Sequence, residues 1–182
     1  PERLFDILAE YGLAPRAHLL EIGPGTGQAT RRLLESGAAR VVAVEPDSEL
    51  AAHLAGWGEA RLDVRNQPFG AAVSGDCSFD LIVAATSFHW LEAGPALRDV
   101  RRLLKPGGAF AMWWNVFHEP REDRLFDALF DGLPRPPSLI SGRHYSLDVA
   151  ARSDELAAAG LTGVRHDLLD RMIEMTPASL RA

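Results

Sequence analysis

The sequence has a single cysteine and no long apolar run. Cys77 cannot close a disulfide within the chain, which excludes a disulfide-stapled secreted scaffold and favours a reducing compartment. No stretch reaches the ~18 consecutive apolar residues of a membrane-spanning helix, and the first residues lack the apolar core of a signal peptide. We therefore expect a cytoplasmic protein that does not enter a membrane.

Positive charge is also scarce. The chain has 19 basic and 25 acidic residues and a net charge of −6, so we expect no nucleic-acid partner. The histidines show no paired metal-ligand spacing, and we predict no metal site. With 182 residues, 47% of them hydrophobic and 24% charged, the chain fits a single globular domain over residues 1–182, as a monomer or a homodimer.

What the sequence does contain is an alternation of two kinds of segment. Short, continuous apolar runs predict buried strands at residues 18–22, 40–45, 81–85 and 109–114. Amphipathic stretches predict helices at residues 2–11, 28–36, 47–55 and 94–104. Apolar runs without alternation are typical of parallel strands covered on both faces. The predicted fold class is therefore α/β, a doubly wound, mostly parallel Rossmann-like sheet with helices on both faces.

The last third of the chain departs from this rhythm. Residues 115–146 hold four prolines and several aromatics around a short helical patch at residues 121–130, which indicates an insertion or lid. We expect a helix at residues 153–160, a possible strand at residues 164–169, and the start of another helix at residues 177–182.

The sharpest motif lies where the first predicted strand meets a helix, and it reads Glu21-Ile22-Gly23-Pro24-Gly25-Thr26-Gly27. Glycines let the backbone turn tightly and let a ligand approach without meeting a Cβ. The dinucleotide fingerprint lacks its third glycine, because Gln28 or Thr30 takes that place in the two possible registers. A phosphate loop is excluded because the chain has no Gly-Lys pair. The Glu21 carboxylate would repel a pyrophosphate and could attract an ammonium group.

This acid-x-G-x-G-x-G pattern resembles the class I methyltransferases that use S-adenosylmethionine. Residues 41–46, 79–85 and 102–108 are similar to the family's second strand, its fourth strand and the turn into its fifth, in the family's order. Residues 87–91, Ser-Phe-His-Trp-Leu, are similar to its small-molecule branch, methyltransferase type 11. The resemblance implies S-adenosylmethionine as cofactor, S-adenosylhomocysteine as product and a small-molecule methyl acceptor.

The resemblance also implies a cofactor site at the ends of the first strands. Glu45 would bind both ribose hydroxyls, since one carboxylate can accept two vicinal donors. The adenine contact falls on Asp63 or, in a shifted register, on Asn66. The expected cofactor residues are Glu21, Gly23, Pro24, Gly25, Gly27, Glu45, Pro46, Asp63, Asn66, Phe69 and Ala85.

The loop after the family's fourth strand faces the transferred methyl group. His89 is the candidate general base there, although a histidine beside a tryptophan can also be a packing residue. Phe88, Trp90 and Trp114 are the candidate substrate contacts, together with the insertion.

An inactive cofactor-binding module of the same fold is the alternative function, and the missing third glycine disfavours a nicotinamide oxidoreductase. The family's closing β-hairpin is incomplete here, and the helix that commonly covers the cofactor is missing before Pro1. We therefore expect a protein that is longer at both ends.

Overall fold

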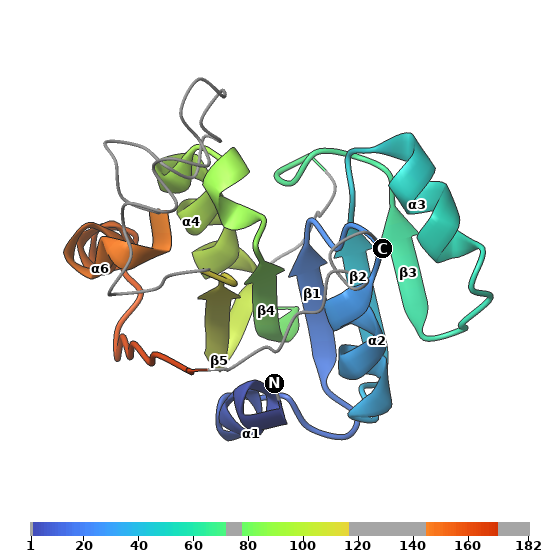
Figure 1. The fold of residues 1–182 in the computed structure, drawn as a ribbon, viewed down its shortest axis with the longest axis horizontal. Coiled ribbons are helices and arrows are strands. Elements are labelled where there is room, and N and C mark those ends of the chain that lie inside the picture. The colour runs from blue at the N-terminus through green and yellow to red at the C-terminus, as the bar shows by residue number, and fades with distance from the viewer. Residues whose placement is uncertain (1, 72–77, 117–144, 171–182) are drawn as a thin grey trace, which may run out of the picture.

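The computed structural model describes residues 2–71, 78–116 and 145–170. In these ranges, five parallel strands form one sheet in the order β3-β2-β1-β4-β5 (Figure 1). The strands are β1 (His18–Ile22), β2 (Arg40–Val44), β3 (Leu62–Arg65), β4 (Phe79–Ala85) and β5 (Leu104–Trp113). The α/β fold class predicted from the alternating segments is confirmed.

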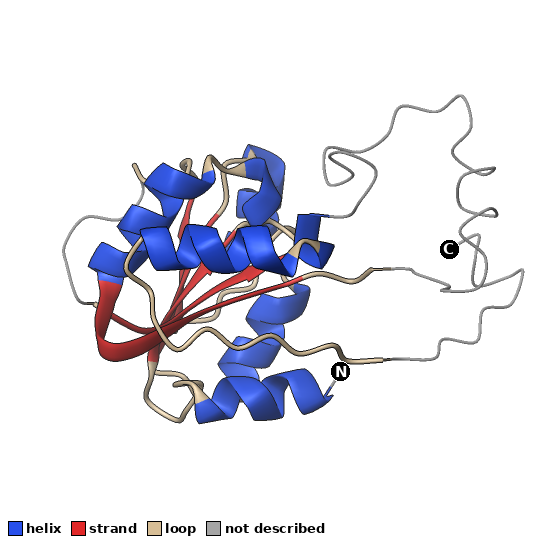
Figure 2. Ribbon diagram, turned by 90° about the vertical axis from the view of Figure 1, so that its left-hand side faces the viewer, coloured by secondary structure: helices blue, strands red, loops and turns tan. Residues whose placement is uncertain are grey.

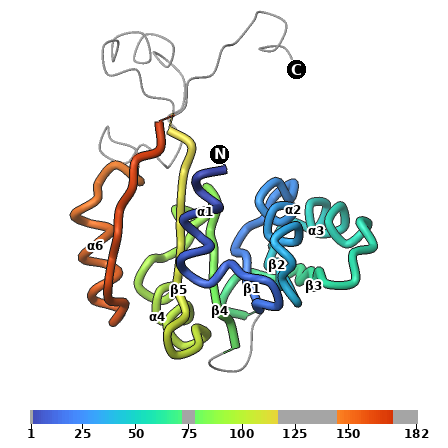
Figure 3. Tube along the Cα trace, turned by 90° about the horizontal axis from the view of Figure 1, so that it is seen from below, coloured from blue at the N-terminus to red at the C-terminus, as the bar shows by residue number. Residues whose placement is uncertain are grey.

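Helices lie on both sides of this sheet (Figure 2). They are α1 (Glu2–Glu10), α2 (Gln28–Glu35), α3 (Ser48–Ala55), α4 (Ala93–Leu103) and α6 (Val149–Ala158), with short 3-10 helices η1 (Phe88–Trp90) and η3 (Tyr145–Leu147). Along the sheet, α6 lies at the β5 end and α3 at the β3 end (Figures 1 and 3). None of these helices combines the length and the apolar composition that crossing a bilayer requires.

Two hydrophobic cores result, one on each face of the sheet. Successive strand residues point to opposite faces, so Leu20 of β1 packs in the core with α4 and α6 while Leu19 packs in the core with α1 and α2. Both residues are fully buried. Covering of both faces explains why the strands are apolar throughout instead of alternating.

The strand order sets the position of the site. β1 lies between β2 and β4, so the chain turns to opposite sides of β1 at this point. Ligands of open α/β sheets bind in the crevice beyond the carboxyl ends of the strands at such a switch point. Because the strands are parallel, the residues that follow them meet at one edge of the sheet: Gly23, Glu45, Asn66, Thr86 and Trp114.

Helix α3 begins at Ser48, one residue after the predicted start, because Asp47 caps it. The Asp47 side chain accepts hydrogen bonds from the backbone N–H groups of Glu49 at 2.9 Å and Leu50 at 3.1 Å. This is the usual N-terminal cap, which satisfies donors that have no partner inside the helix. The cap also holds the chain directly after Glu45, at the carboxyl end of β2.

The turn expected within residues 102–108 overlaps the start of β5. Leu104 pairs with Phe79, and the register then shifts so that Ala109 pairs with Leu81. Gly107 absorbs the shift with a φ of +79°, a left-handed conformation that glycine adopts without steric cost. Strand β5 therefore starts earlier than the apolar run at residues 109–114 indicated.

The prediction of a strand at residues 164–169 is wrong. That segment is largely exposed and is not part of the sheet, because no described strand supplies ladder hydrogen bonds to it. The helix expected at residues 153–160 is present but begins earlier, at Val149. The predictions for residues 121–130 and 177–182, and for most of the insertion at residues 115–146, lie outside the described residues.

Candidate cofactor and acceptor site

The glycine-rich loop turns the chain from β1 into α2 through three left-handed residues. The φ angles are +64° at Gly23, +58° at Gly25 and +84° at Gly27. A Cβ at Gly23 would lie 2.7 Å from the Cβ of Ser87, and one at Gly27 would lie 2.4 Å from the Trp57 ring. A Cβ at Gly25 would meet no atom within 4 Å. Packing therefore requires two of the glycines, while Gly25 borders open space.

Glu45 presents an oriented carboxylate beside this loop. One oxygen, Oε2, accepts a hydrogen bond from the Gly25 N–H at 3.0 Å, and Oε1 accepts one from the Asp47 N–H at 3.0 Å. The side chain is only 5% exposed. Two backbone donors on one carboxylate hold it in place before any ligand arrives, and each oxygen keeps further acceptor capacity.

Glu21 lies beneath the loop, fully buried on the α2 side of the sheet. The Thr30 hydroxyl donates to its Oε2 at 2.6 Å, while Oε1 has no hydrogen-bond partner among the described residues. Burial raises the pKa of Glu21 to about 7, the Thr30 hydrogen bond lowers it, and the charge of Glu45 raises it further. A buried, unpartnered carboxyl oxygen is rare in native proteins and suits a nearby cationic group.

A cleft of about 2230 Å³ borders the carboxyl edge of the sheet and continues along β5 to α1 and residues 160–170. The expected cofactor residues that line it are Gly23, Pro24, Gly25, Glu45, Pro46, Phe69 and Ala85. Thr26, Gln28 and Ala29 at the start of α2 line it too, although the sequence analysis assigned them no role. Glu21 and Gly27 do not line the cleft and lie one layer behind it, where they support the loop.

Neither of the two candidate adenine contacts, Asp63 and Asn66, lines the cleft. Asp63 sits within β3, does not line the cleft, and forms ion pairs with Arg40 and with Arg65, the latter at 3.1 Å. Partial burial raises the pKa of Asp63, but the two arginines outweigh it and hold that pKa below its usual range. Asn66 follows β3, and its amide donates to the backbone carbonyls of Glu45 at 2.9 Å and Pro46 at 3.1 Å. Asp63 is thus paired with two arginines, Asn66 supports the backbone after β2, and the adenine contact stays a prediction.

The chain leaves β4 through a strained residue. Thr86 has a φ of +56°, which is unusual for a β-branched side chain, and its N–H donates to the Trp113 carbonyl at 2.8 Å. The next residue, Ser87, donates its hydroxyl hydrogen bond to the carbonyl of Ile22 at the end of β1. These two contacts tie the start of η1 to both strands that flank β4.

Phe88, an expected substrate contact, is a core residue. Its side chain is fully buried, does not line the cleft, and packs against the ring of Phe110 with centroids 5.3 Å apart. The ring therefore anchors η1 to the core, which corrects the role expected from the sequence. A phenylalanine in an apolar motif gives no local signal that separates these two roles.

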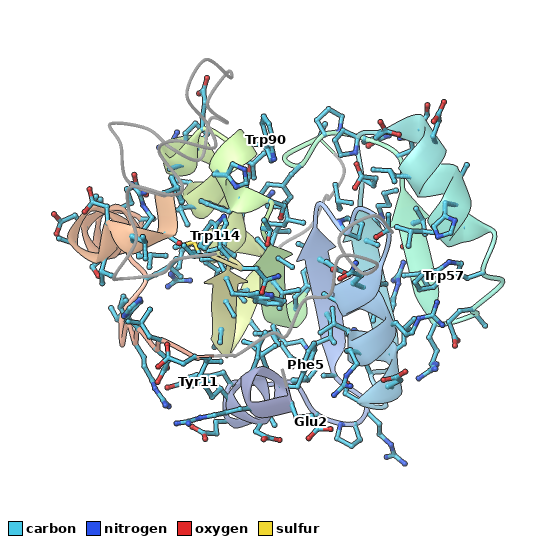
Figure 4. The ribbon with its side chains drawn as sticks, in the orientation of Figure 1. Glu2, Phe5, Tyr11, Trp57, Trp90 and Trp114 are labelled. Atoms are coloured by element: carbon cyan, nitrogen blue, oxygen red, sulfur yellow. The ribbon has the colours of Figure 1, made fainter. Side chains whose placement is uncertain are left out.

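The other aromatic residues of this region form one group, here called the acceptor-side cluster, made of His89, Trp90, Trp114 and Tyr145. The His89 ring lies 5.1 Å from the Trp90 ring and 6.4 Å from the Trp114 ring, centroid to centroid. Trp90, 68% exposed, and Trp114 line the cleft, whereas His89 and Tyr145 do not. Figure 4 shows both tryptophans on one side of the molecule, away from Trp57.

Tyr145 joins the cluster from η3, far along the chain. Its ring lies 5.3 Å from the Trp114 ring, and the guanidinium carbon of Arg152 stacks 3.7 Å from its centroid. Arg152 is held by Glu155 through hydrogen bonds of 2.8 Å and 2.7 Å. Burial raises the pKa of Tyr145 to about 12, against the lowering effect of the Arg152 charge. Tyr145 belongs to the insertion that the sequence offered as a substrate contact. No local pattern points to Arg152 or Glu155, because only the tertiary fold brings them into this region.

The parallel sheet, its switch point and the oriented acid beyond β2 define the class I methyltransferase fold. Residues 20–112, about half of the chain, match the methyltransferase domain family. The chain therefore belongs to this family, and the resemblance to the S-adenosylmethionine-dependent enzymes is confirmed. In the described residues, no group of three or more His, Cys, Asp or Glu side chains could hold a metal ion.

Similar proteins are found both by sequence and by structure. An uncharacterized methyltransferase of Mycobacterium tuberculosis is 35% identical over 115 residues, covering 62% of this chain and 44% of that protein. A highly reducing polyketide synthase of Emericella nidulans is 37% identical over 127 residues, covering 62% of this chain and 5% of that protein. The crystal structure of the [4+2]-cyclase SpnF superposes with a TM-score of 0.63 at 25% identity, covering 87% of this chain and 56% of that one.

Proposed function

We propose that this domain transfers a methyl group from S-adenosylmethionine to a nucleophilic O, N, S or C atom of a small molecule. The observation that carries the proposal is the Glu45 carboxylate, whose two oxygens are held by the N–H groups of Gly25 and Asp47 beside open space in the cleft. When bound, the cofactor supplies an electrophilic methyl on its sulfonium. The protein has to bind it and place the acceptor atom in line behind that methyl.

Glu45, Gly25 and Glu21 contribute to cofactor binding in different ways. Glu45 is suited to accept hydrogen bonds from the two ribose hydroxyls, because its oxygens are already aligned and desolvated. Gly25 lets the ligand approach the backbone, since no Cβ fills the adjoining space. Glu21 lies beneath the loop, where a bound cofactor ammonium would favour its ionised form, and its unpartnered Oε1 supports this role.

The acceptor belongs on the Trp90 and Trp114 side of the cleft. Both rings line the cleft near the carboxyl ends of β4 and β5, where they can exclude water and hold an apolar part of the substrate. A small-molecule acceptor is supported by the likeness to a polyketide synthase. The single cysteine supports the cytoplasm as the place of action.

Calorimetric titration with S-adenosylhomocysteine tests the cofactor site. Glu45→Ala removes a charged partner of two hydroxyls, which should weaken binding about ten- to a hundred-fold. The affinity for methylthioadenosine, which keeps the ribose, should fall by a similar factor. Glu49→Ala is the matched control, because this exposed acid lies on the neighbouring helix α3 and should bind as the wild type does. Unchanged affinity in Glu45→Ala would overturn the assignment.

A catalytically inactive module of the same fold is the second candidate function. The likeness to a protein named as a cyclase shows that a chain of this fold need not be a methyltransferase by name, so a domain that binds the cofactor without transferring its methyl group is kept as the second candidate. Both candidates predict binding of S-adenosylhomocysteine, so turnover separates them. A screen for transfer of labelled methyl from S-adenosylmethionine to a library of small acceptors should yield a product only for the enzyme.

A further inference from the structure

We propose that His89 is a positioning residue, which fixes the Trp114 indole in the wall of the acceptor site, and that it is not the general base of the reaction. The inference rests on the proposed function, because it assigns a part of the site where the acceptor would bind. Three observations carry it: the position of His89 behind the cleft, the hydrogen bond that it receives, and the rigidity of its support.

The first observation is the position of His89. The two tryptophans on either side of His89 line the cleft, whereas the imidazole itself does not. Its ring is half-buried between Trp90 and Trp114, with the Tyr145 ring 6.4 Å away. A general base has to come within about 2.6–3.2 Å of the proton that it removes, or reach it through one water. His89 instead contacts the residues that would contact the acceptor.

The second observation is the direction of the hydrogen bond. The indole Nε1 of Trp114 is only a donor, and it lies 3.0 Å from Nδ1 of His89. Nδ1 is therefore the acceptor, and the neutral imidazole carries its proton on Nε2. A base acting through Nε2 would need the opposite tautomer, in which Nδ1 carries the proton and the Trp114 hydrogen bond is lost. The bond and the base role exclude each other.

The third observation is the rigidity of what carries His89. The buried Phe88 ring anchors η1 in the core, and Ser87 ties its start to the end of β1. The Thr86 N–H joins the same loop to the Trp113 carbonyl, one residue before Trp114. Two separate hydrogen bonds therefore hold this part of the chain. The loop backbone binds the Trp113 carbonyl, and the His89 ring accepts from the Trp114 indole. An indole held in this way has one orientation, which is what a substrate wall requires.

Two substitutions of His89 distinguish positioning from base catalysis. In His89→Asn, the side-chain oxygen can occupy the place of Nδ1 and accept from Trp114, but no group remains that could act as a base. In His89→Ala the acceptor is lost as well. Two-dimensional NMR of the indole N–H groups reads out the bond directly, with the Trp114 signal assigned by its loss in Trp114→Phe.

If His89 positions Trp114, His89→Ala should shift the NMR signal of the Trp114 indole N–H. The exchange of this proton with water should become about five- to tenfold faster, which matches the loss of one hydrogen bond. His89→Asn should restore most of both. The ring nitrogens of His89, observed at mildly alkaline pH, should show the proton on Nε2. The control is His53→Ala, since His53 lies 6.0 Å from Trp57 on the exposed surface and should leave the Trp114 signal unchanged.

An unmoved Trp114 signal in His89→Ala, or a proton on Nδ1 in the wild type, would overturn the inference. With an acceptor from the methyl-transfer screen, His89→Asn should keep kcat within about threefold, whereas loss of a general base costs about 10²–10⁴-fold. The NMR measurements need neither cofactor nor acceptor. If the wild type fails to bind S-adenosylhomocysteine, the proposed function fails while the assignment of His89 is still decided.

Discussion

The two halves of the cleft are built in different ways. The half proposed to bind the cofactor, here called the cofactor half, consists of the glycine-rich loop and Glu45, and its contacts are backbone N–H groups on a carboxylate and glycines without side chains. The half proposed to hold the acceptor, here called the acceptor half, is lined by Trp90 and Trp114 of the acceptor-side cluster, which gathers side chains from η1, the end of β5 and η3. The first half depends on backbone shape, and the second depends on side chains that distant segments bring together.

This difference explains which half a sequence motif can describe. A backbone that must turn sharply beside a ligand accepts few residue types. Such a loop can therefore be recognised from neighbouring positions in the sequence, such as Gly23 and Gly25. An aromatic wall can be assembled from many residue types in many places, provided that the fold brings them together. The comparison therefore predicts strict local requirements in the cofactor half and tolerance of substitution at the rim of the acceptor half.

The largest expected effect separates two glycines of the same loop. Gly27→Ala should lower the free energy of unfolding by about 3–5 kcal/mol, because its methyl would meet the Trp57 and Leu54 side chains at 2.4 Å and 2.5 Å and its φ is left-handed. Gly25→Ala should cost only about 1–2 kcal/mol, since its methyl would enter open space and only the backbone is strained.

Chemical denaturation measures both variants. Ligand binding should instead depend on Gly25. The bulkier Gly25→Val fills the space that the cofactor needs, so it should abolish S-adenosylhomocysteine binding in calorimetry. Equal losses of stability at the two positions would mean that packing does not distinguish these glycines. Unchanged affinity in Gly25→Val would show that the ligand does not approach the loop there.

A smaller effect is expected from the buried acid under the loop. Glu21 has a pKa of about 7 in the folded protein, compared with 4.5 for an exposed glutamate, so between these values the folded state binds the proton that the unfolded state has lost. The stability contributed by Glu21 is full below about pH 4.5 and falls by about 3 kcal/mol as pH rises through 7. Glu21→Gln should remove this decline, as denaturation at several pH values would show. Parallel pH profiles for both proteins would contradict the assignment.

The smallest effect is expected at the rim of the acceptor half. Trp90 is 68% exposed, so Trp90→Ala should change the free energy of unfolding by no more than about 0.5 kcal/mol and leave the affinity for S-adenosylhomocysteine within about twofold. Its fully buried neighbour provides the contrast, because Phe88→Ala should cost about 3–5 kcal/mol. Comparable losses in thermal unfolding would show that the exposed ring is part of the core.

The sequence predicted the backbone around the glycine-rich loop. The parallel sheet, the glycine-rich turn and the place of Glu45 after β2 all follow from local patterns that the structure contains. The wrong predictions concern sequence patterns that are compatible with two different structures. Phe88 was expected at the substrate, but its side chain packs in the core against Phe110. The segment at residues 164–169 has strand-like residues but no partner among the described strands.

By itself, the sequence determined the fold class, the family and the backbone-built part of the site, because periodicity and glycine placement act over a few neighbouring residues. Only the tertiary structure decided which side chains face the cleft. Phe88 and Trp90 are two residues apart, and one is fully buried while the other is largely exposed. His89, between them, receives its hydrogen bond from Trp114 at the far end of the next strand. Burial and hydrogen bonding depend on contacts between distant segments, and no local pattern encodes them.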